Sequence, residues 1–591
     1  MPKDFAPAPI HYRVEVADLN AHLFRVTLTV AHPQAQQRVS LPAWIPGSYL
    51  VREFSKNLQR LQARQGGKPV ALQQLDKCSW QVDCTTQELL VLSYEVYAFD
   101  NSVRAAWLDA TRGFFNGTSL CLRVEGQEDS AHELELVASR AVAHWSVATG
   151  LSPLKVNRRG FGNYRATDYD ELVDSPVEMG NFWSGAFTAG GVPHRFVVTG
   201  VPPSFDGERL LADTRKICEA EIRLWHSPST GRRHKAPHRD YLFLLNATDD
   251  GYGGLEHRNS TALICARRDL PRLGAKPADG YTTLLGLISH EYFHTWNVKR
   301  LRPTEFARYD YTQENYTQLL WFFEGFTSYY DDLLLRRAGL LDDAGYLKLL
   351  NKTINQVMQT PGRAVQSVAQ ASFDAWVKYY RQDENTPNAT VSYYSKGALV
   401  ALCLDLSLRA DGSHTLDEVM RALWQRCQGG PMSEGDLLQV LQDIAGRSYA
   451  REIKRWVHST AELPLKELLE RHGVVIQEEP AQLAQQLGLR VTEGAAIQIK
   501  TVLRGGAAEQ AGFAAGDEWL GIEVGAGKNR SGWRLTKLDD LPLYAGPHSK
   551  VDALVARDKR LLKLPLKLPR AVTTWRLSVR DKPLIEAWLA A

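Results

Sequence analysis

The sequence predicts a multidomain α+β protein with three parts in succession along the chain. Short segments of alternating apolar and polar residues dominate residues 1–180, and helical patterns dominate from about 311 to 470. An apolar stretch between them, residues 284–296, carries two histidines four positions apart. A chain of 591 residues with 44% hydrophobic and 23% charged residues is typical of a globular protein with several cores. We therefore expect an N-terminal β domain, a central domain with the functional site, and a small C-terminal β domain.

The N-terminal domain is expected over residues 1–180 as an antiparallel, β-sandwich-like fold. Segments such as HYRVEV, FRVTLTV and ELLVLSYEVYAF alternate in polarity and are separated by turn residues, which is the pattern of half-buried strands. Residues 41–57, LPAWIPGSYLVREFSKN, form an aromatic loop with proline and glycine. The loop has no obvious chemistry of its own, so we expect it to be structural or to line a cleft.

The central domain is expected over residues 181–475, with an α/β part to about residue 300 and a helical part after it. Strands are predicted at HRFVVTG, DYLFLLNA and STALICA, a helix at 212–225, and a loop at TDDGYGGLEH. The region that follows reads as almost wholly helical. A cleft between two such parts is where a substrate site is expected.

The motif His290-Glu291-Tyr292-Phe293-His294 is an HExxH pattern inside the apolar stretch, which we predict to be a buried helix. Residues four apart on a helix lie on one face, about 6 Å from each other, so both imidazoles can bind one ion. Neutral imidazole suits zinc, and a catalytic zinc site takes three protein ligands. Glu291 then lies where it can act as general base toward water. The motif therefore predicts metal-assisted hydrolysis.

The alternative is that His290 and His294 are hydrogen-bonded core histidines with Glu291 as their partner. Burying a glutamate with two histidines is costly unless a cation compensates its charge, and this cost favours the metal. Zinc is the expected ion, but the same ligands accept cobalt and other divalent ions.

Two glutamates compete for the third ligand position. Glu314 lies in the polar run TQEN, which is typical of a solvated helix start, whereas Glu324 is surrounded by aromatic residues in an otherwise apolar helix. A lone carboxylate in apolar surroundings needs a partner such as a cation, so we favour Glu324.

The segment WFFEGFTSYY, which contains Glu324, resembles the third-ligand helix of the gluzincin aminopeptidases, whose ligand glutamate also precedes Gly-Phe. Together, HEYFHTWNVKRLRP, the long gap to WFFEGF and the glycine-rich tail resemble the glycyl aminopeptidase family of metallopeptidases, peptidase family M61. The resemblance covers nearly the whole chain and includes PAWIPGSY in the N-terminal domain. It implies a thermolysin-like catalytic domain, one zinc ion per chain, and a C-terminal PDZ domain over residues 476–591.

The segment Gly253-Gly254-Leu255-Glu256-His257 is similar to the GAMEN strand of the related aminopeptidase N family, whose glutamate holds the α-amino group of the substrate. The resemblance implies that Glu256, with Gly253 and Gly254, binds substrate. A carboxylate near the metal would fix the scissile bond one residue from the ammonium, which makes an exopeptidase. His257 replaces the Asn of the pattern and leaves the backbone contacts open. The alternative is an acidic residue in a glycine-rich turn.

The segment Tyr393-Tyr394-Ser395-Lys396-Gly397 is similar to the YxKG motif, whose tyrosine donates a hydrogen bond to the oxyanion of the tetrahedral intermediate. A phenol suits this task because it is neutral at working pH and can be fixed by packing. Tyr394 matches the motif by position. Tyr393 is its rival, and core packing is the alternative role for either.

In the implied PDZ domain, Leu487-Gly488-Leu489 is the candidate loop for a peptide carboxylate and residues 549–560 are the candidate helix. The segment AGFAAGD resembles the corresponding turn of bacterial PDZ domains. Packing of this domain against the catalytic domain remains an equal alternative to ligand binding.

The leading functional hypothesis is a zinc aminopeptidase that acts on peptides with a free N-terminus, with glycine or alanine preferred only because the family name implies it. An endopeptidase and a PDZ-bearing binding or quality-control protein with a vestigial metal site are the alternatives. Seven dispersed cysteines without a CxxC pair, no secretory signal and no run of eighteen apolar residues lead us to expect a cytoplasmic protein without a membrane partner. The net charge of +3 gives no sign of nucleic-acid binding, and the oligomeric state stays open.

Overall fold

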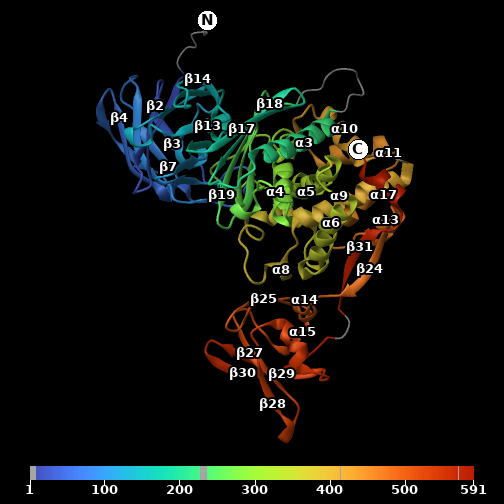
Figure 1. Cartoon of the computed structure of the whole chain (residues 1–591). Coiled ribbons are helices and arrows are strands. Elements are labelled where there is room, and N and C mark those ends of the chain that lie inside the picture. Colours follow the sequence, from blue (N-terminus) through green and yellow to red (C-terminus); the bar gives the residue numbers. More distant parts are fainter. Residues whose placement is uncertain (1–7, 227–235, 413, 570–571, 591) are drawn as a thin grey trace. The chain divides into compact units, whose positions relative to one another are not determined.

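The structure is a computed structural model, and it describes residues 8–226, 236–412, 414–569 and 572–590 (Figure 1). The chain divides into two compact units. The first comprises residues 1–316, 338–340 and 420–433, and the second comprises residues 317–337, 341–419 and 434–591.

The N-terminal region forms three β-sheets around one hydrophobic core. The largest sheet has the order β14 (Ser152–Val156), β15 (Gly162–Ala166), β12 (His132–Val137), β1 (Ile10–Asp18), β2 (Leu23–Val30), β8 (Leu90–Tyr97), β4 (Leu58–Gln65), β5 (Lys68–Val70). The second is β13 (Ser146–Thr149), β16 (Val177–Gly180), β10 (Arg112–Phe115), β9 (Ala106–Leu108), and the third is β11 (Arg123–Val124), β3 (Gln36–Ser40), β7 (Ser79–Asp83), β6 (Leu72–Gln74). The predicted β domain is therefore confirmed. Its pairings are antiparallel except that of β1 with β12, which is parallel.

A five-stranded mixed sheet follows, in the order β17 (Trp183–Ala189), β18 (Val192–Thr199), β19 (Tyr241–Thr248), β21 (Ser260–Ala266), β20 (Tyr252–Glu256). Helices α3 (Gly207–Trp225) and α4 (Asp279–Phe293) contact strands of this sheet. The predicted loop at TDDGYGGLEH is wrong in part, because residues 252–256 form edge strand β20. Glycine is rare in strands, and pairing with β21 overrides this preference.

The helical part contains α5 (Leu320–Arg337), α6 (Asp343–Met358), α7 (Val368–Phe373), α9 (Tyr393–Gly412), α10 (Leu416–Arg426), α11 (Glu434–Ala445), α12 (Ala450–Trp456), α13 (Leu465–Arg471). Two glycines let α5 and α9 approach closely. A Cβ atom at Gly325 would lie 2.5 Å from the Cα of Gly397, and one at Gly397 would collide with the backbone oxygen of Trp321. Neither helix can carry a side chain at this crossing without moving its partner.

The C-terminal β domain has its own core, with members from Leu487 to Leu566. Its sheet has the order β25 (Leu489–Glu493), β26 (Ile497–Val502), β27 (Glu518–Val524), β29 (Lys550–Arg557), β30 (Arg560–Lys567), with β28 (Ser531–Arg534) on β27. Helices α14 (Leu483–Leu487), α15 (Ala507–Ala511) and α16 (Leu541–Ala545) complete it. The helix predicted at 549–560 is wrong, because this segment contains strand β29. Its residues are buried at every second position, which is the period of a strand.

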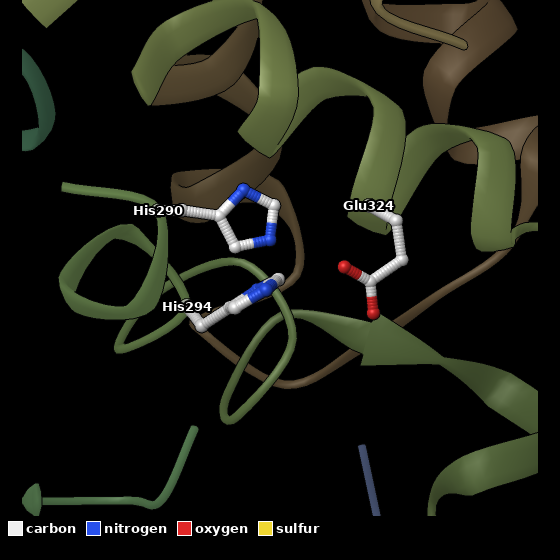
Figure 2. Close-up of side chains that lie close together, drawn as sticks. All are labelled: His290, His294 and Glu324. Carbon is white, nitrogen blue, oxygen red and sulfur yellow. The ribbon is translucent and has the colours of Figure 1, made fainter. Parts of the chain in front are cut away.

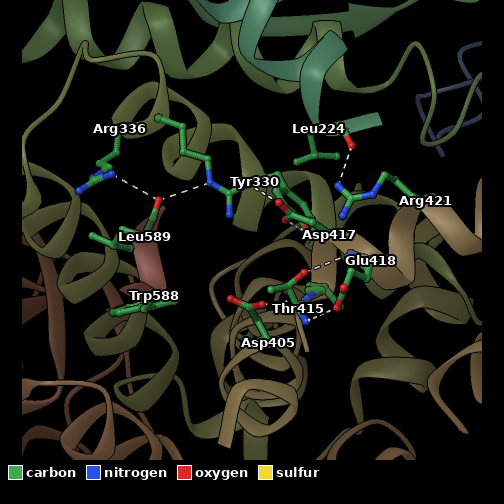
Figure 3. A network of polar contacts seen from close by, with 12 residues as sticks. Leu224, Tyr330, Arg336, Asp405, Thr415, Asp417, Glu418, Arg421, Trp588 and Leu589 are labelled. Atoms are coloured by element: carbon green, nitrogen blue, oxygen red, sulfur yellow. Dashed lines mark hydrogen bonds and ion pairs between the residues drawn. The ribbon is translucent and has the colours of Figure 1, made fainter. Parts of the chain in front are cut away.

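The end of the chain leaves this domain and returns to the helical part. Strand β31 (Thr573–Val579) pairs with β24 (Val474–Pro480), and α17 (Lys582–Leu589) packs near α5 and α9. The guanidinium groups of Arg336 and Arg337 donate hydrogen bonds to the backbone oxygen of Leu589, at 3.5 and 3.4 Å (Figure 3). Both β31 and α17 lie within the range 476–591 that was expected for the C-terminal domain.

Arg337 also joins α17 to a buried charge network, in which Figure 3 labels Tyr330 and Asp417. Its Nη1 lies 2.8 Å from Oδ2 of Asp417, and the Tyr330 hydroxyl donates to Oδ1 of Asp417 at 2.9 Å. The side chains of Arg337 and Asp417 are only 5% and 8% exposed, so each charge depends on the other for compensation.

Among the helices of the described residues, none combines the length and the apolar character needed to cross a bilayer.

Replacing Gly397 by Ala should lower the free energy of unfolding by about 1–3 kcal/mol, because the added methyl group overpacks the crossing of α5 and α9. Gly412, on the same helix, is exposed and gives the matched control, Gly412→Ala, which should shift stability by less than about 1 kcal/mol. Urea denaturation followed by circular dichroism measures both. Equal stability of the two variants would contradict the proposed close contact.

Replacing Trp588 by Ala should destabilise the second unit by about 3–5 kcal/mol, since its side chain is 1% exposed and packs against Tyr346 at a ring distance of 5.9 Å. Leu584→Ala on the same helix is the control, because Leu584 is 44% exposed. Differential scanning calorimetry should show a large fall in Tm for the first variant only. Similar Tm values for both would mean that α17 adds no packing energy.

Candidate metal centre and substrate site

Helix α4 carries His290 in its last turn, and His294 directly follows the helix as its C-cap with helical backbone angles, so both imidazoles lie at the same end of the helix. The helix is buried over most of its length, as the apolar pattern predicted. The ring centroids of His290 and His294 are 4.7 Å apart. His294 is 1% exposed and Glu291 5%, whereas His290 is partly exposed. The helical spacing therefore brings the two imidazoles within reach of one ion.

A backbone carbonyl sets the tautomer of His294. Its Nδ1 lies 2.7 Å from the carbonyl oxygen of Asn297. A carbonyl oxygen only accepts hydrogen bonds, so Nδ1 carries the proton and Nε2 keeps a lone pair for a metal. Metal-binding histidines commonly have such a second partner, which fixes the orientation of the ring.

Glu324 of α5 completes the group (Figure 2). One ligand atom from each of His290, His294 and Glu324 lies within 4.8 Å of the others, and Glu324 is 2% exposed. Two imidazoles and one carboxylate are the donor set of many catalytic zinc sites, so these residues fit the expected ion. Neither metal-compatible group among the described residues contains Glu314, which lies in a loop.

Glu256, at the end of β20, belongs to the second such group. One of its carboxylate oxygens lies within 4.8 Å of a ligand atom of both Glu291 and His294. Glu256 is 4% exposed, and no hydrogen bond or ion pair joins its carboxylate to the described residues. It is therefore a buried carboxylate beside the HExxH helix that is paired with none of the described residues.

Two glycines allow backbone segments to lie against these carboxylates. A Cβ atom at Gly254 would collide with the Glu291 carboxylate, so β20 passes directly over the HExxH helix. A Cβ atom at Gly47 would lie 2.5 Å from Oε2 of Glu256, and the φ angle of Gly47 is +89°. The aromatic loop at 41–57 therefore lies against Glu256. Arg104 donates a hydrogen bond to the backbone oxygen of Gly254 at 3.1 Å, whereas binding of substrate by Gly253 and Gly254 stays a prediction.

The two candidate tyrosines differ in exposure. Tyr393 is fully buried, whereas Tyr394 is partly exposed, and their ring centroids are 4.8 Å apart. Burial and the nearby charge of Glu324 raise the pKa of Tyr394, so its phenol is protonated at neutral pH. Tyr394 is thus the more exposed of the two tyrosines, and it lies within electrostatic range of Glu324.

Sequence reasoning missed a charged cluster next to Glu256. The carboxylate of Asp174, in the N-terminal region, contacts the side chains of His257 and Lys299. In the sequence, His257 directly follows Glu256, and Lys299 lies shortly after the HExxH motif. The order of residues does not reveal that Lys299 is buried or that it meets Asp174. The only signal was His257, which departs from the pattern of the related strand.

In the C-terminal domain, Leu487 and Leu489 are buried, and Gly488 ends α14 with φ of +71°. Strand β25 follows, and among the strands of the described residues it pairs only with β26, which makes it an edge strand. The side-chain amide of Asn388 donates a hydrogen bond to the backbone oxygen of Val502 at 2.9 Å and accepts one from the backbone N–H of Arg504 at 2.8 Å. The C-terminal domain therefore contacts the helical part.

Two family models match the sequence. Residues 11–181 match the Peptidase M61 N-terminal domain, and residues 283–400 match the M61 glycyl aminopeptidase. No curated protein matches the chain.

Solved structures are also similar. An aminopeptidase N family protein from Idiomarina loihiensis has 37% sequence identity and a TM-score of 0.92, over 98% of this chain and 100% of that chain. An M1 zinc metallopeptidase from Deinococcus radiodurans has 16% identity and a TM-score of 0.47, over 77% of this chain and 94% of that chain. Given the two domain matches and the full-length similarity to the Idiomarina protein, the chain belongs to the M61 peptidase family and is a zinc metallopeptidase.

Proposed function

We propose that the protein is an aminopeptidase that removes N-terminal residues from peptides with a free α-amino group. The observation that carries this proposal is the unpartnered Glu256 carboxylate near Glu291 and His294. A buried anion is costly unless a cation pairs with it, and the α-ammonium of a peptide is such a cation. Holding that ammonium here places the first peptide bond, and no later one, at the metal centre.

The roles of the other residues follow from their chemistry. His290, His294 and Glu324 would hold one zinc ion per chain, which supplies Lewis-acid polarisation when bound. Glu291 takes the proton of the attacking water and delivers it to the leaving amine. The Tyr394 hydroxyl donates a hydrogen bond to the developing oxyanion.

A preference for a small first residue, such as glycine or alanine, belongs to the same proposal. The matching family model is that of a glycyl aminopeptidase, and the backbone at Gly47 lies against the Glu256 carboxylate. A loop this close to the ammonium site limits the space beside the first residue.

The C-terminal domain is proposed to be a PDZ domain with Leu487-Gly488-Leu489 as its carboxylate-binding loop. Support comes from the left-handed Gly488 and from the unpaired edge of β25, where an extended peptide can add as a strand.

A peptide that begins Gly-Ala should lose single N-terminal residues, whereas its N-acetylated twin should stay intact, because acetylation removes the charge that Glu256 binds. Mass spectrometry after incubation measures both, and a chelator should stop the reaction.

Glu256→Gln should raise the KM for the free peptide about 10- to 100-fold, since a hydrogen bond to a charged group is lost. The Glu291→Gln chain is the negative control for turnover.

Internal cuts in both peptides would instead identify an endopeptidase. A zinc-loaded protein that cleaves neither peptide would favour a binding protein with a vestigial site.

Replacing Tyr394 by Phe should lower kcat about 100- to 1000-fold and leave KM nearly unchanged, because the hydroxyl acts on the oxyanion and not on the bound substrate. Tyr393→Phe is the matched control, since Tyr393 is a fully buried neighbour. Steady-state kinetics on the free peptide separate the two constants. A larger loss of kcat in Tyr393→Phe would transfer the role to Tyr393.

A further inference from the structure

A largely buried ion pair lies next to Glu256. The ammonium of Lys299 is 2.8 Å from Oδ1 of Asp174, and Nδ1 of His257 is 3.0 Å from the same oxygen. The backbone N–H of Arg258 donates to Oδ2 of Asp174 at 3.0 Å. The side chains of Lys299, His257 and Asp174 are 3%, 1% and 15% exposed.

Three distant segments meet in this cluster. Asp174 follows α2 (Tyr169–Val173) in the N-terminal region, Lys299 lies in the turn after α4, and His257 directly follows Glu256. A cavity of about 10 Å³ beside Asp174 and Lys299 is also lined by Ile45 and Pro46. That volume holds one water at most.

Lys299 lies close to Glu256 but is not paired with it. It shares the Asp174 oxygen with His257, the chain neighbour of Glu256, and the loop at 45–47 both lines the cavity at Lys299 and lies against Glu256. Burial alone would lower the pKa of Lys299, but the charges of Asp174, Tyr309 and Glu256 outweigh this effect and raise it. Its ion pair is with Asp174, and none joins it to Glu256. Asp174 and Lys299 therefore compensate each other, and no ion pair among the described residues compensates Glu256.

We propose that Asp174 is a positioning residue that holds the Lys299 ammonium away from Glu256 and so keeps Glu256 open to the α-ammonium of the substrate. This inference rests on the proposed role of Glu256 as the ammonium anchor. A lysine ammonium and a peptide α-ammonium have the same charge and similar donors. Lys299 is thus a tethered competitor for the same carboxylate, and a tethered group acts at a high effective concentration.

Removal of the Asp174 charge frees this competitor. A buried ammonium without a counter-ion is unstable, and Glu256, whose chain neighbour His257 also bonds Asp174, offers a carboxylate close to Lys299. Lys299 then pairs with Glu256 and occupies the substrate's place. Asparagine at position 174 keeps an acceptor for the Arg258 N–H, so the change affects mainly the charge.

The test compares Asp174→Asn, Lys299→Met and the double variant in the full-length zinc-loaded protein. Asp174→Asn should raise KM for the free Gly-Ala peptide about 10- to 100-fold with little change in kcat, since the Glu256 contact is blocked before chemistry. Lys299→Met should leave KM at or below the wild-type value. The double variant should recover most of the loss, because the competitor is gone.

Binding gives a second readout that does not depend on turnover. The same substitutions are made in a Glu291→Gln background, and calorimetry measures the Kd of the Gly-Ala dipeptide. The Kd should follow the same order, weak for Asp174→Asn and restored in the double variant. Thermal unfolding of each chain shows whether it is folded.

A double variant as weak as Asp174→Asn would overturn the proposal, because a structural role of Asp174 is not rescued by removing lysine. A raised KM in Lys299→Met would also overturn it, and this variant alone decides if Asp174→Asn does not fold. Wild-type protein that fails to distinguish free from acetylated peptide would remove the proposed function as well. If the wild-type protein cleaves only the free peptide but Asp174→Asn leaves KM unchanged, the role of Asp174 would be wrong and the proposed function would stand.

Discussion

The cost of burying carboxylates around the HExxH helix is the constraint on which this site depends. Glu256, Glu291 and Glu324 are each at most 5% exposed, and each shares a metal-compatible group with His294. Negative charges at this density repel one another in a medium that screens poorly. In the proposed function, a divalent cation bound by His290, His294 and Glu324 would relieve part of this repulsion, and a substrate ammonium at Glu256 would relieve another part. The stability of the centre and its affinity for ligands therefore have the same electrostatic origin.

Glycine allows the backbone to reach these charges. Gly254 lets the edge strand lie against Glu291, and Gly47 lets the aromatic loop lie against Glu256. Gly325 and Gly397 let the two helices that carry Glu324 and Tyr394 approach each other closely. In each case a side chain would displace a functional group or a neighbouring backbone, so these glycines fix the geometry of groups that they do not touch chemically.

The Asp174–Lys299 pair addresses a different problem, which is how a carboxylate stays both buried and available. A lysine placed directly on Glu256 would stabilise the empty protein but would block the substrate ammonium that we propose binds there. Pairing that lysine with Asp174 satisfies its charge and leaves Glu256 unpartnered. A direct Lys299–Glu256 pair would stabilise the folded protein. Without that pair, the interaction of Glu256 with a cation can contribute to ligand binding.

The sequence by itself determined what depends on local spacing. The HExxH helix, the strands of the N-terminal region and the preference for Glu324 over Glu314 follow from periodicity and from the apolar neighbours of each residue. Tertiary structure decided what depends on contacts distant in the sequence. Residues 252–256 form a strand because β21 pairs with them, and residues 550–557 form a strand because their alternating burial fits a sheet. Likewise, Asp174 meets Lys299 across 125 positions of the chain, and the end of the chain returns to α5. A local pattern records which conformation a segment can adopt, whereas pairing and burial are set by partners that the pattern does not contain.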